Sequence, residues 1–396
     1  MRILIFDTHY QESLRRVYEN DPQLAQRPAR EQLRFIYDTG FGRADSLPLN
    51  LAKLGHEAQQ FIVNAAPIQI RWAEENGLKI DTKRSFTLKV QQRLQQQADR
   101  LRTKPHALGR YIPTWEKEVL KAQVEAFKPD VIFICDVLYL PADFHASLKE
   151  STKLLVGEMA YPIPPSLDLR PFDLVISAAP HFVERIRKAG TRSELLRLGF
   201  EETILKRIEP QPKNAELAFV GSVGKDHQQR LALLEELCRN VPVSFWGAGA
   251  DSLPPESPLR GRVSPPLWGY DMYRQLQRSK IALNVHIDMA EQYAANMRLY
   301  EATGVGTMLL TDWKTNLHEL FEIGKEVVAY RSPEECVELA NYYLAHDSER
   351  DAIAKAGQER TLSEHSYYHR MQELTEILNR YLSHSPRASA RGRVGR

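Results

Sequence analysis

The sequence predicts an α/β protein of two domains, each built around a parallel β-sheet. Short apolar runs alternate with helical stretches along the chain, which is the pattern of strands covered by helices on both faces. The length, 396 residues, exceeds what one ordinary hydrophobic core supports. A proline-containing segment at residues 210–212 interrupts the pattern near the middle of the chain. We therefore expect two doubly wound domains joined by a linker at this segment.

The composition is that of a globular protein, with 43% hydrophobic and 26% charged residues. No apolar run is long enough to span a bilayer, and the apolar start at residues 2–6 is too short for a signal peptide. Three cysteines, Cys135, Cys238 and Cys336, lack metal-type spacing and predict buried thiols in a reducing compartment. A net charge of +2 does not indicate nucleic-acid binding. We expect a cytoplasmic protein.

The first domain is expected to comprise residues 1–208. Its strands are predicted at residues 2–6, 61–63, 128–136, 153–156, 172–177 and 195–199. Helices are predicted over residues 11–35, over much of 89–127 with a break at 103–114, and over 181–188. A further helix is expected to begin at the loop formed by residues 38–46 and to end at residue 54. The first strand lacks the glycine-rich turn that follows it in dinucleotide-binding domains.

Four polar residues lie at the ends of predicted strands in this domain, namely His9, Asp136, Glu158 and His181. The carboxyl ends of parallel strands form the ligand-binding edge of α/β folds. A carboxylate or an imidazole at this edge can act as a general base, although such residues more often cap turns. We take Asp136, Glu158 and His9 as the catalytic candidates.

The second domain is expected to comprise residues 209–367. Its strands are predicted at residues 218–220, 243–246, 281–286, 308–310 and 327–330, with helices from 227 and over 333–345, the latter begun by Ser332 as N-cap. The loop after the first of these strands contains Gly221, Ser222, Gly224 and Lys225. It is not a Walker loop, because Asp226 replaces the Ser or Thr. Its backbone amides can still face a phosphate, with Lys225 or Arg230 adding charge.

The segment at residues 296–312 carries the strongest functional pattern. We expect Asn296 to cap a short helix, Gly304 to take the left-handed position after it, and residues 308–310 to form a buried strand. Arg298 and Glu301 are three residues apart and therefore share one helix face. Arg298 can bind a diphosphate. We expect Glu301 to face a wet cleft, where its carboxylate can accept hydrogen bonds from two ribose hydroxyls. An ordinary Arg–Glu surface pair is the alternative.

Two further residues have open interpretations. Trp268 precedes a predicted helix and either stacks on a nucleobase or packs in the core. His286 ends an apolar strand and is either a donor-binding residue or a core-edge histidine. The sequence shows no catalytic Ser/His/Asp set, no metal-ligand cluster and no Asp-x-Asp motif.

The pattern Arg298-x-x-Glu301-Ala302-x-Gly304-x-Gly306 resembles the donor-site segment of GT-B glycosyltransferases. More narrowly, it resembles the CgeB-like group, also known as spore-maturation-type or family 1 glycosyltransferases. The resemblance continues through residues 316–321, 324–330 and 365–370 and covers the first half of the chain only in outline. One position departs from the pattern, since many retaining members have a second Glu eight residues before Glu301, where this chain has Tyr293.

The resemblance implies two Rossmann-like domains that face a cleft, the GT-B fold, and a hexosyltransferase that needs no cofactor and no bound metal. The donor, a nucleotide-diphospho-sugar, would bind to the second domain, and a saccharide, protein or small-molecule acceptor to the first. The donor-binding candidates are Gly221, Ser222, Lys225, His286, Asn296, Arg298 and Glu301. The helix at residues 368–382 could cross back onto the first domain.

Residues 383–396 hold four arginines and no acid, which predicts a disordered tail that either is solvated or contacts an anionic surface. Two alternatives to a glycosyltransferase stay open. A nucleotide-sugar epimerase of the same fold would convert the donor sugar without an acceptor. A degenerate domain would act as a coat or scaffold component and would have no use for a ribose clamp.

Overall fold

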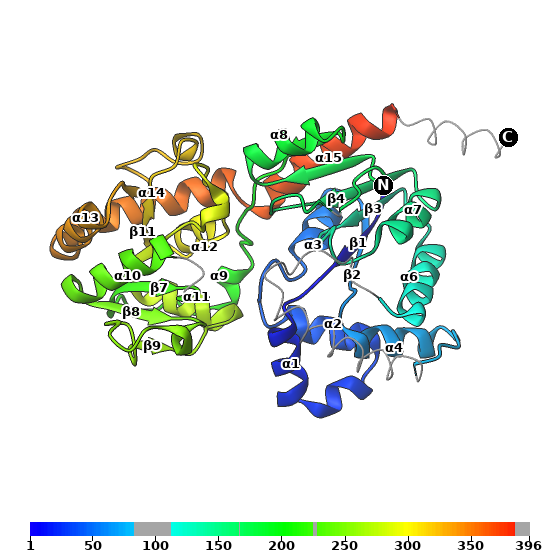
Figure 1. Ribbon diagram of the computed structural model, residues 1–396, viewed down its shortest axis with the longest axis horizontal. Coiled ribbons are helices and arrows are strands. Elements are labelled where there is room, and N and C mark those ends of the chain that lie inside the picture. The colour runs from blue at the N-terminus through cyan, green and yellow to red at the C-terminus, as the bar shows by residue number, and fades with distance from the viewer. Residues whose placement is uncertain (83–111, 166, 225–227, 385–396) are drawn as a thin grey trace. The chain divides into compact units, whose positions relative to one another are not determined.

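Two parallel sheets of six strands organise the chain, with strand orders β2-β1-β3-β4-β5-β6 and β12-β11-β10-β7-β8-β9 (Figure 1). The structure, a computed structural model, describes residues 1–82, 112–165, 167–224 and 228–384. Neighbouring strands of both sheets pair in parallel, and helices flank them. The predicted α/β fold with two parallel-sheet domains is therefore confirmed.

The first sheet comprises β1 (Arg2–Asp7), β2 (Glu57–Ile62), β3 (Val131–Ile134), β4 (Leu154–Glu158), β5 (Leu174–Ser177) and β6 (Ser193–Leu195). Its helices are α1 (Gln11–Asn20), η1 (Pro22–Gln26), α2 (Ala29–Tyr37), α3 (Ser46–Lys53), α4 (Ala66–Glu75), α6 (Thr114–Phe127), α7 (Ala142–Glu150) and α8 (Pro180–Lys188). The predicted helix over 11–35 is wrong as one element, because Pro22 lacks the backbone N–H that would continue α1. Residues 83–111 of the predicted region 89–127 lie outside the described residues.

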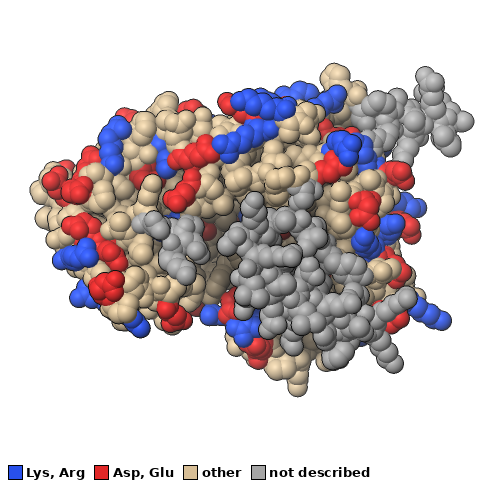
Figure 2. Space-filling model, in the orientation of Figure 1, with Lys and Arg blue, Asp and Glu red and all other residues tan. Residues whose placement is uncertain are grey.

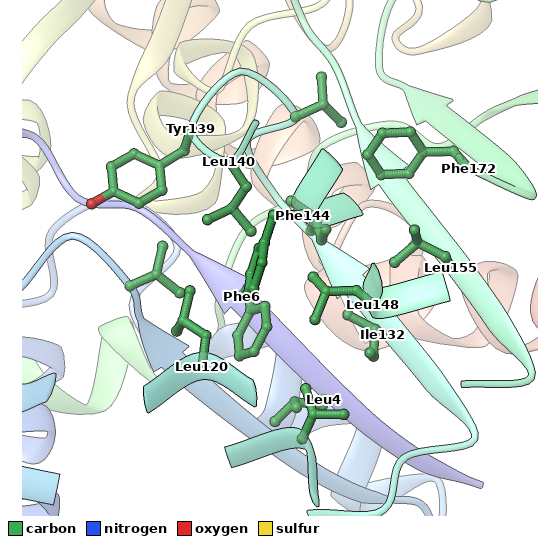
Figure 3. Packing of buried hydrophobic residues seen from close by; sticks show 14 of the residues in the cluster. Leu4, Phe6, Leu120, Ile132, Tyr139, Leu140, Phe144, Leu148, Leu155 and Phe172 are labelled. Atoms are coloured by element: carbon green, nitrogen blue, oxygen red, sulfur yellow. The ribbon is translucent and has the colours of Figure 1, made fainter. Parts of the chain in front are cut away.

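The core of this sheet lies between its central strands and the helices that follow them. Phe6 of β1 lies beside Phe144 in Figure 3, and Leu4, Ile132 and Leu155 belong to the same buried cluster. These side chains are almost entirely buried, and each contributes about 1.5–3 kcal/mol to stability through removal from water. The uninterrupted apolar runs of β3 and β4 are thus explained by burial on both faces.

The second sheet comprises β7 (Ala215–Val220), β8 (Val243–Trp246), β9 (Val263–Ser264), β10 (Ser279–Asn284), β11 (Met308–Asp312) and β12 (Val328–Tyr330). Its helices are α9 (Ile204–Arg207), α10 (Gln228–Asn240), η2 (Ala250–Ser252), α11 (Gly269–Arg278), η3 (Asp288–Ala290), α12 (Arg298–Gly304), η4 (Leu317–Glu319), α13 (Pro333–Ala345), α14 (Asp347–Glu364) and α15 (Tyr367–Ser383). The predicted cap of α13 is confirmed, since Ser332 Oγ accepts a hydrogen bond from the Glu335 amide at 3.2 Å.

Helix α14 was not predicted from the sequence. Ile353 is its one large apolar buried residue, and the other buried positions are Arg350, Ala354, Gly357 and Thr361. Gly357 is needed because a Cβ there would lie 2.3 Å from the Glu326 carbonyl oxygen. A helix that packs through small residues has no strong hydrophobic periodicity, which is the signal that sequence reasoning uses.

The chain divides into two compact units, each of which is made of segments that are not continuous in the sequence. Unit 1 contains Met1–Asp38, Ala44–Leu196 and the described chain from Met371 onward, and unit 2 contains Thr39–Arg43 and Arg197–Arg370. Helix α15 begins in unit 2 and ends in unit 1, where the hydroxyl of Tyr381 donates to Glu194 at 3.0 Å. Thr39–Arg43 joins unit 2 because the Thr39 carbonyl caps α11 by accepting from the Tyr270 amide at 3.2 Å.

The strand order reverses its direction once in each sheet. In the first sheet this switch point lies between β1 and β3, and in the second between β7 and β10. Loops at the carboxyl ends of the two strands diverge there, so α/β folds bind ligands at this position. We therefore expect a ligand site of unit 2 to be formed by the residues that follow β7 and β10.

The surface and the thiols agree with the composition. Basic and acidic side chains are interspersed over the face shown in Figure 2. All three cysteines are free, Cys238 and Cys336 being buried and Cys135 half-buried. Within the described ranges, every helix is too short or too polar to cross a membrane.

Candidate functional site

Two guanidinium groups bind the ends of β7 and β10, the strands on either side of the switch point in unit 2. Arg298, the first residue of α12, donates from Nη2 to the Val220 carbonyl at 3.1 Å. Arg230, in the first turn of α10, donates to the Val285 carbonyl at 2.7 Å and to the Ser222 carbonyl at 3.4 Å. Burial lowers the pKa of Arg230. Both cations thus lie where a phosphate could approach the sheet edge.

The predicted contact between Arg298 and Glu301 is present. Arg298 Nη1 lies 3.1 Å from Glu301 Oε2, and the two side chains are 15% and 9% exposed. The Tyr273 hydroxyl of α11 also donates to Glu301, and Arg298 Nη1 contacts the Met272 sulfur at 3.2 Å. Burial raises the pKa of Glu301, an effect that the Arg298 charge and the Tyr273 hydrogen bond only partly oppose.

The expectation that Glu301 faces a wet cleft is wrong. The residue is only 7% exposed, because α12 packs between α11 and α14 with all residues from Leu299 to Gly304 buried. A carboxylate has about four acceptor sites, so Glu301 keeps capacity for ribose hydroxyls beside its two protein partners. The consequence is that this residue contributes to stability as well as to any ligand contact.

The cap prediction for Asn296 is also wrong. Met297 occupies the N-cap position without a side-chain cap bond, and the Asn296 amide instead donates to Asn284 Oδ1 at 2.7 Å. This pair ties the start of α12 to the end of β10. The left-handed glycine is Gly306, with φ +76°, rather than Gly304. Gly304 is needed for another reason, since a Cβ there would lie 2.4 Å from the ring of Phe200.

His286, two residues after the end of β10, is held by the last residue of β11. Its Nδ1 lies 2.7 Å from Asp312 Oδ1, and its backbone N–H donates to the same oxygen at 3.0 Å. Lys314 lies 3.1 Å from the other carboxylate oxygen. Burial would raise the pKa of Asp312, but the hydrogen bond and the charge of His286, together with the Lys314 charge, outweigh it and lower the pKa to about 2.

The glycine-containing loop after β7 lies against the turn after β8. The Gly221 amide donates to the Trp246 carbonyl at 2.9 Å, and a Cβ on Gly247 would lie 1.7 Å from the Gly221 carbonyl oxygen. Gly221 is half-buried and Ser222 is exposed. Lys225 lies outside the described residues.

Trp268 has a packing role in the structure. Its ring meets Phe41 edge-on with centroids 4.9 Å apart, and Phe41 belongs to the Thr39–Arg43 segment of unit 2. The segment approaches so closely that a Cβ on Gly269 would lie 1.8 Å from the Thr39 carbonyl oxygen. Sequence reasoning placed this segment with the first domain and therefore missed the contact.

The catalytic candidates of unit 1 lie at or near the switch point between β1 and β3. Thr8, after β1, donates to Asp136 Oδ2 at 3.4 Å, and Asp136 follows β3. Asp136 Oδ1 accepts from the Tyr161 hydroxyl at 2.6 Å and from the Leu138 amide at 3.0 Å. Burial and the Asp136 charge raise the pKa of Tyr161, so the phenol stays a donor.

The other unit 1 candidates differ in their distance from Asp136 along the sheet. His9 follows β1, where its backbone N–H donates to the Asn64 side chain at 3.0 Å. Glu158 ends β4, one strand beyond β3. His181 is buried in the first turn of α8 with its ring 4.0 Å from that of Phe182. His9 and Asp136 thus follow the two strands that flank the switch point, whereas His181 lies in the helix after β5.

Three residues of these sites were not assigned a role from the sequence, namely Tyr161, Tyr273 and Asp312. Asp312 had a usable signal, because it comes two residues after the apolar run at 308–310 and is therefore expected at a strand end. The two tyrosines had none, since each reaches its carboxylate through tertiary packing. Among the described residues, no three His, Cys, Asp or Glu side chains gather as a metal site would require.

Comparison with known proteins agrees with this architecture. Residues 228–376 match the family model described as glycosyl transferase-like, which covers less than half of the chain. No curated protein sequence matches the chain. Among solved structures, the chain is similar to HepE of Anabaena in complex with UDP and glucose, with TM-score 0.60, 13% identity and coverage of 96% of this chain and 99% of that one.

Two other solved structures are similar over nearly the whole chain. Sucrose-phosphate synthase from Thermosynechococcus elongatus has TM-score 0.56 and 11% identity, with 97% of this chain and 99% of that one covered. A protein of Listeria monocytogenes assigned as a UDP-N-acetylglucosamine 2-epimerase has TM-score 0.50 and 12% identity, with 98% of each chain covered. At these identities the likeness shows the fold alone, and this fold is the GT-B fold.

Proposed function

We propose that the protein is a glycosyltransferase that moves a hexosyl group from a nucleotide-diphospho-sugar to an acceptor hydroxyl. The observation that carries the proposal is the buried Arg298–Glu301 pair at the β7/β10 switch point. The pair lies inside the region that matches the glycosyl transferase-like family model. Its sequence context also supports membership of the CgeB-like group.

Each donor group has a chemically suited partner in unit 2. Glu301 accepts the ribose hydroxyl protons, and Arg298 and Arg230 bind the diphosphate at the ends of β7 and β10. Gly221 and Ser222 lie at the carboxyl end of β7, where backbone amides suit phosphate oxygens. We also assign Asn296 to the donor side, because its bond to Asn284 holds the start of α12.

The two guanidinium groups account for a reaction that needs no resident metal. The leaving diphosphate gains negative charge as the glycosidic bond breaks, and fixed cations stabilise that charge in a partly dry site. Arg298 and Arg230 are both largely buried and held by backbone carbonyls, so they need little reorganisation. Activity that persists after treatment with EDTA would support this part of the proposal.

Unit 1 would bind the acceptor, and Asp136 is its best-supported general base. Its Oδ2 accepts only the long Thr8 bond among the contacts described above, whereas Oδ1 already accepts two shorter ones. Oδ2 is therefore the oxygen with capacity for an acceptor hydroxyl proton. Glu158 and His9 are the other candidates for this role.

The test begins with UDP-glucose, because HepE was solved in complex with it and shares the fold. Release of the nucleoside diphosphate is measured for UDP-glucose, UDP-galactose, UDP-N-acetylglucosamine and GDP-mannose, with and without a panel of saccharide acceptors. Acceptor-dependent release supports a transferase. Conversion of the donor sugar without an acceptor would instead show an epimerase, and failure to bind UDP, GDP or ADP in calorimetry would contradict both.

A further inference from the structure

The ring of His286 holds a buried nitrogen that has no protein partner. Its side chain has no exposed surface, and Nε2 makes no hydrogen bond within the described chain. Buried polar atoms are nearly always hydrogen-bonded, so an exception at the edge where α/β folds bind ligands points to an absent partner. Arg230, which binds the carbonyl of the preceding Val285, likewise leaves its Nε without a partner in the described residues.

Asp312 determines which ring nitrogen of His286 carries the proton. Its pKa of about 2 keeps the carboxylate ionised at neutral pH, so it can only accept hydrogen bonds. The 2.7 Å contact with Nδ1 therefore requires the proton to be on Nδ1. In the neutral ring Nε2 is then a lone-pair acceptor, and it needs a ligand group that donates.

Arg230 and Lys314 both bring positive charge to the ends of β10 and β11, and Asp312 and Asp288 are the acids on the same side. A diphosphate has no proton to donate to Nε2, whereas the sugar hydroxyls of a donor do.

We propose that His286 is a specificity-determining residue whose Nε2 accepts a hydrogen bond from a hydroxyl of the transferred sugar, with Asp312 as its positioning residue. The proposal rests on the proposed function, in which Glu301 already takes the ribose hydroxyls. It assigns the sugar to the carboxyl end of β10, beside the diphosphate cations. The sugar hydroxyl keeps its proton, and no bond other than the hydrogen bond forms.

The loop after His286 is held by the segment that follows β11. Residues 287–296 are tied to the segment after β11, where Lys314 donates to the Glu291 carbonyl at 2.7 Å and the Thr315 amide to the Gln292 carbonyl at 2.9 Å. Glu291 has φ +52°, where a residue other than glycine is strained.

Two substitutions at His286 separate a sugar contact from a packing role. His286→Asn places an amide near the position of Nδ1, so it keeps the Asp312 contact and removes Nε2. His286→Gln extends to the position of Nε2 and gives up the Asp312 contact. Calorimetry measures the affinities of wild type and both variants for UDP and UDP-glucose. If wild type binds another screened donor more tightly, that donor and its nucleoside diphosphate are used instead.

We expect His286→Asn to keep its affinity for the nucleoside diphosphate and to bind the nucleotide-sugar about three- to tenfold more weakly, the loss of one neutral hydrogen bond. His286→Gln should keep more of the sugar affinity but melt at a lower temperature. Asp312→Ala removes the oxygen that holds both the backbone N–H and Nδ1 of His286, so it should weaken sugar binding like His286→Asn and keep the affinity for the nucleoside diphosphate.

Three results would overturn the proposal. An equal loss of affinity for both ligands in His286→Asn would show a phosphate contact. No loss of affinity for either ligand would show that His286 has a packing role alone. A wild-type protein that binds the donor no more tightly than the nucleoside diphosphate would show that the protein makes no sugar contact. Sugar transfer by wild type together with any of these results leaves the proposed function intact. If His286→Asn weakens nucleotide-sugar binding as expected but wild type transfers no sugar, the proposed function is overturned and the proposed sugar contact is kept.

Discussion

Arg298 and Glu301 lie 3.1 Å apart beneath the end of β7, in a buried pair that a third side chain, Tyr273, completes. Such a pair is costly to break, because removal of one partner leaves the other charge buried and unpaired. The same two residues are the proposed donor contacts. Substitutions here therefore act on stability and on ligand binding together, and each test needs a control that separates the two.

Glu301→Gln should weaken nucleotide binding by roughly tenfold to a hundredfold, because charge-assisted bonds to the ribose are worth about 1.5–3 kcal/mol each. The melting temperature should also fall, since Arg298 loses its charged partner. Tyr273→Phe is the matched control, because it removes a hydrogen bond to the same carboxylate without removing the proposed ribose contact. Nucleotide affinity that falls equally in both variants, measured on folded protein, would argue against the ribose role.

Arg298→Ala should lower turnover more than it lowers nucleotide affinity. The charge of the leaving diphosphate grows in the transition state, so a cation beside it stabilises that state more than the bound donor. Steady-state rates and calorimetric affinities for the same donor provide the comparison. A variant in which affinity falls while turnover at saturating donor is kept would place Arg298 outside the leaving-group site.

Tyr161→Phe should lower turnover without changing nucleotide affinity, because the phenol contacts Asp136 in unit 1 at 2.6 Å. Asp136→Asn, which removes the proposed base, should abolish most activity and likewise keep the nucleotide affinity. Full turnover in Tyr161→Phe and Asp136→Asn would contradict the proposed role of Asp136.

The protein should lose stability between about pH 6.5 and pH 4, because both units contain a buried neutral histidine. Burial lowers the pKa of His145 in α7 and of His365 before α15 to about 4 each. Since the unfolded chain binds the proton more readily in this window, stability rises with pH across it and is fully present above the unfolded value of about 6.5. Each histidine contributes about 3 kcal/mol.

Thermal unfolding at pH 4.5 and pH 7.5 tests this dependence, with His145→Leu as the informative variant. His145 makes no hydrogen bond within the described residues and packs against Phe172 at 4.7 Å between ring centroids, so a leucine can occupy its site. The variant should lose part of the pH dependence. A melting temperature that changes with pH as steeply as in wild type would show that His145 does not titrate on unfolding.

Residues close in sequence determined much of the architecture. The apolar runs of β3, β4, β10 and β11 predicted buried parallel strands, because burial on both faces leaves no room for polar alternation. The spacing of Arg298 and Glu301 likewise predicted their contact, since helical geometry alone brings residues three apart onto one face. These features depend on local periodicity and not on the rest of the fold.

Tertiary structure decided how exposed the site residues are and which distant partners they meet. Glu301 is buried because α11 and α14 cover its helix, and His286 meets Asp312 because β10 and β11 pair in a register that brings together residues 26 positions apart. The Thr39–Arg43 segment joined unit 2 through close approaches that only glycine allows at residue 269. Strand register and close packing between distant segments arise from the assembled fold, so no local pattern could predict them.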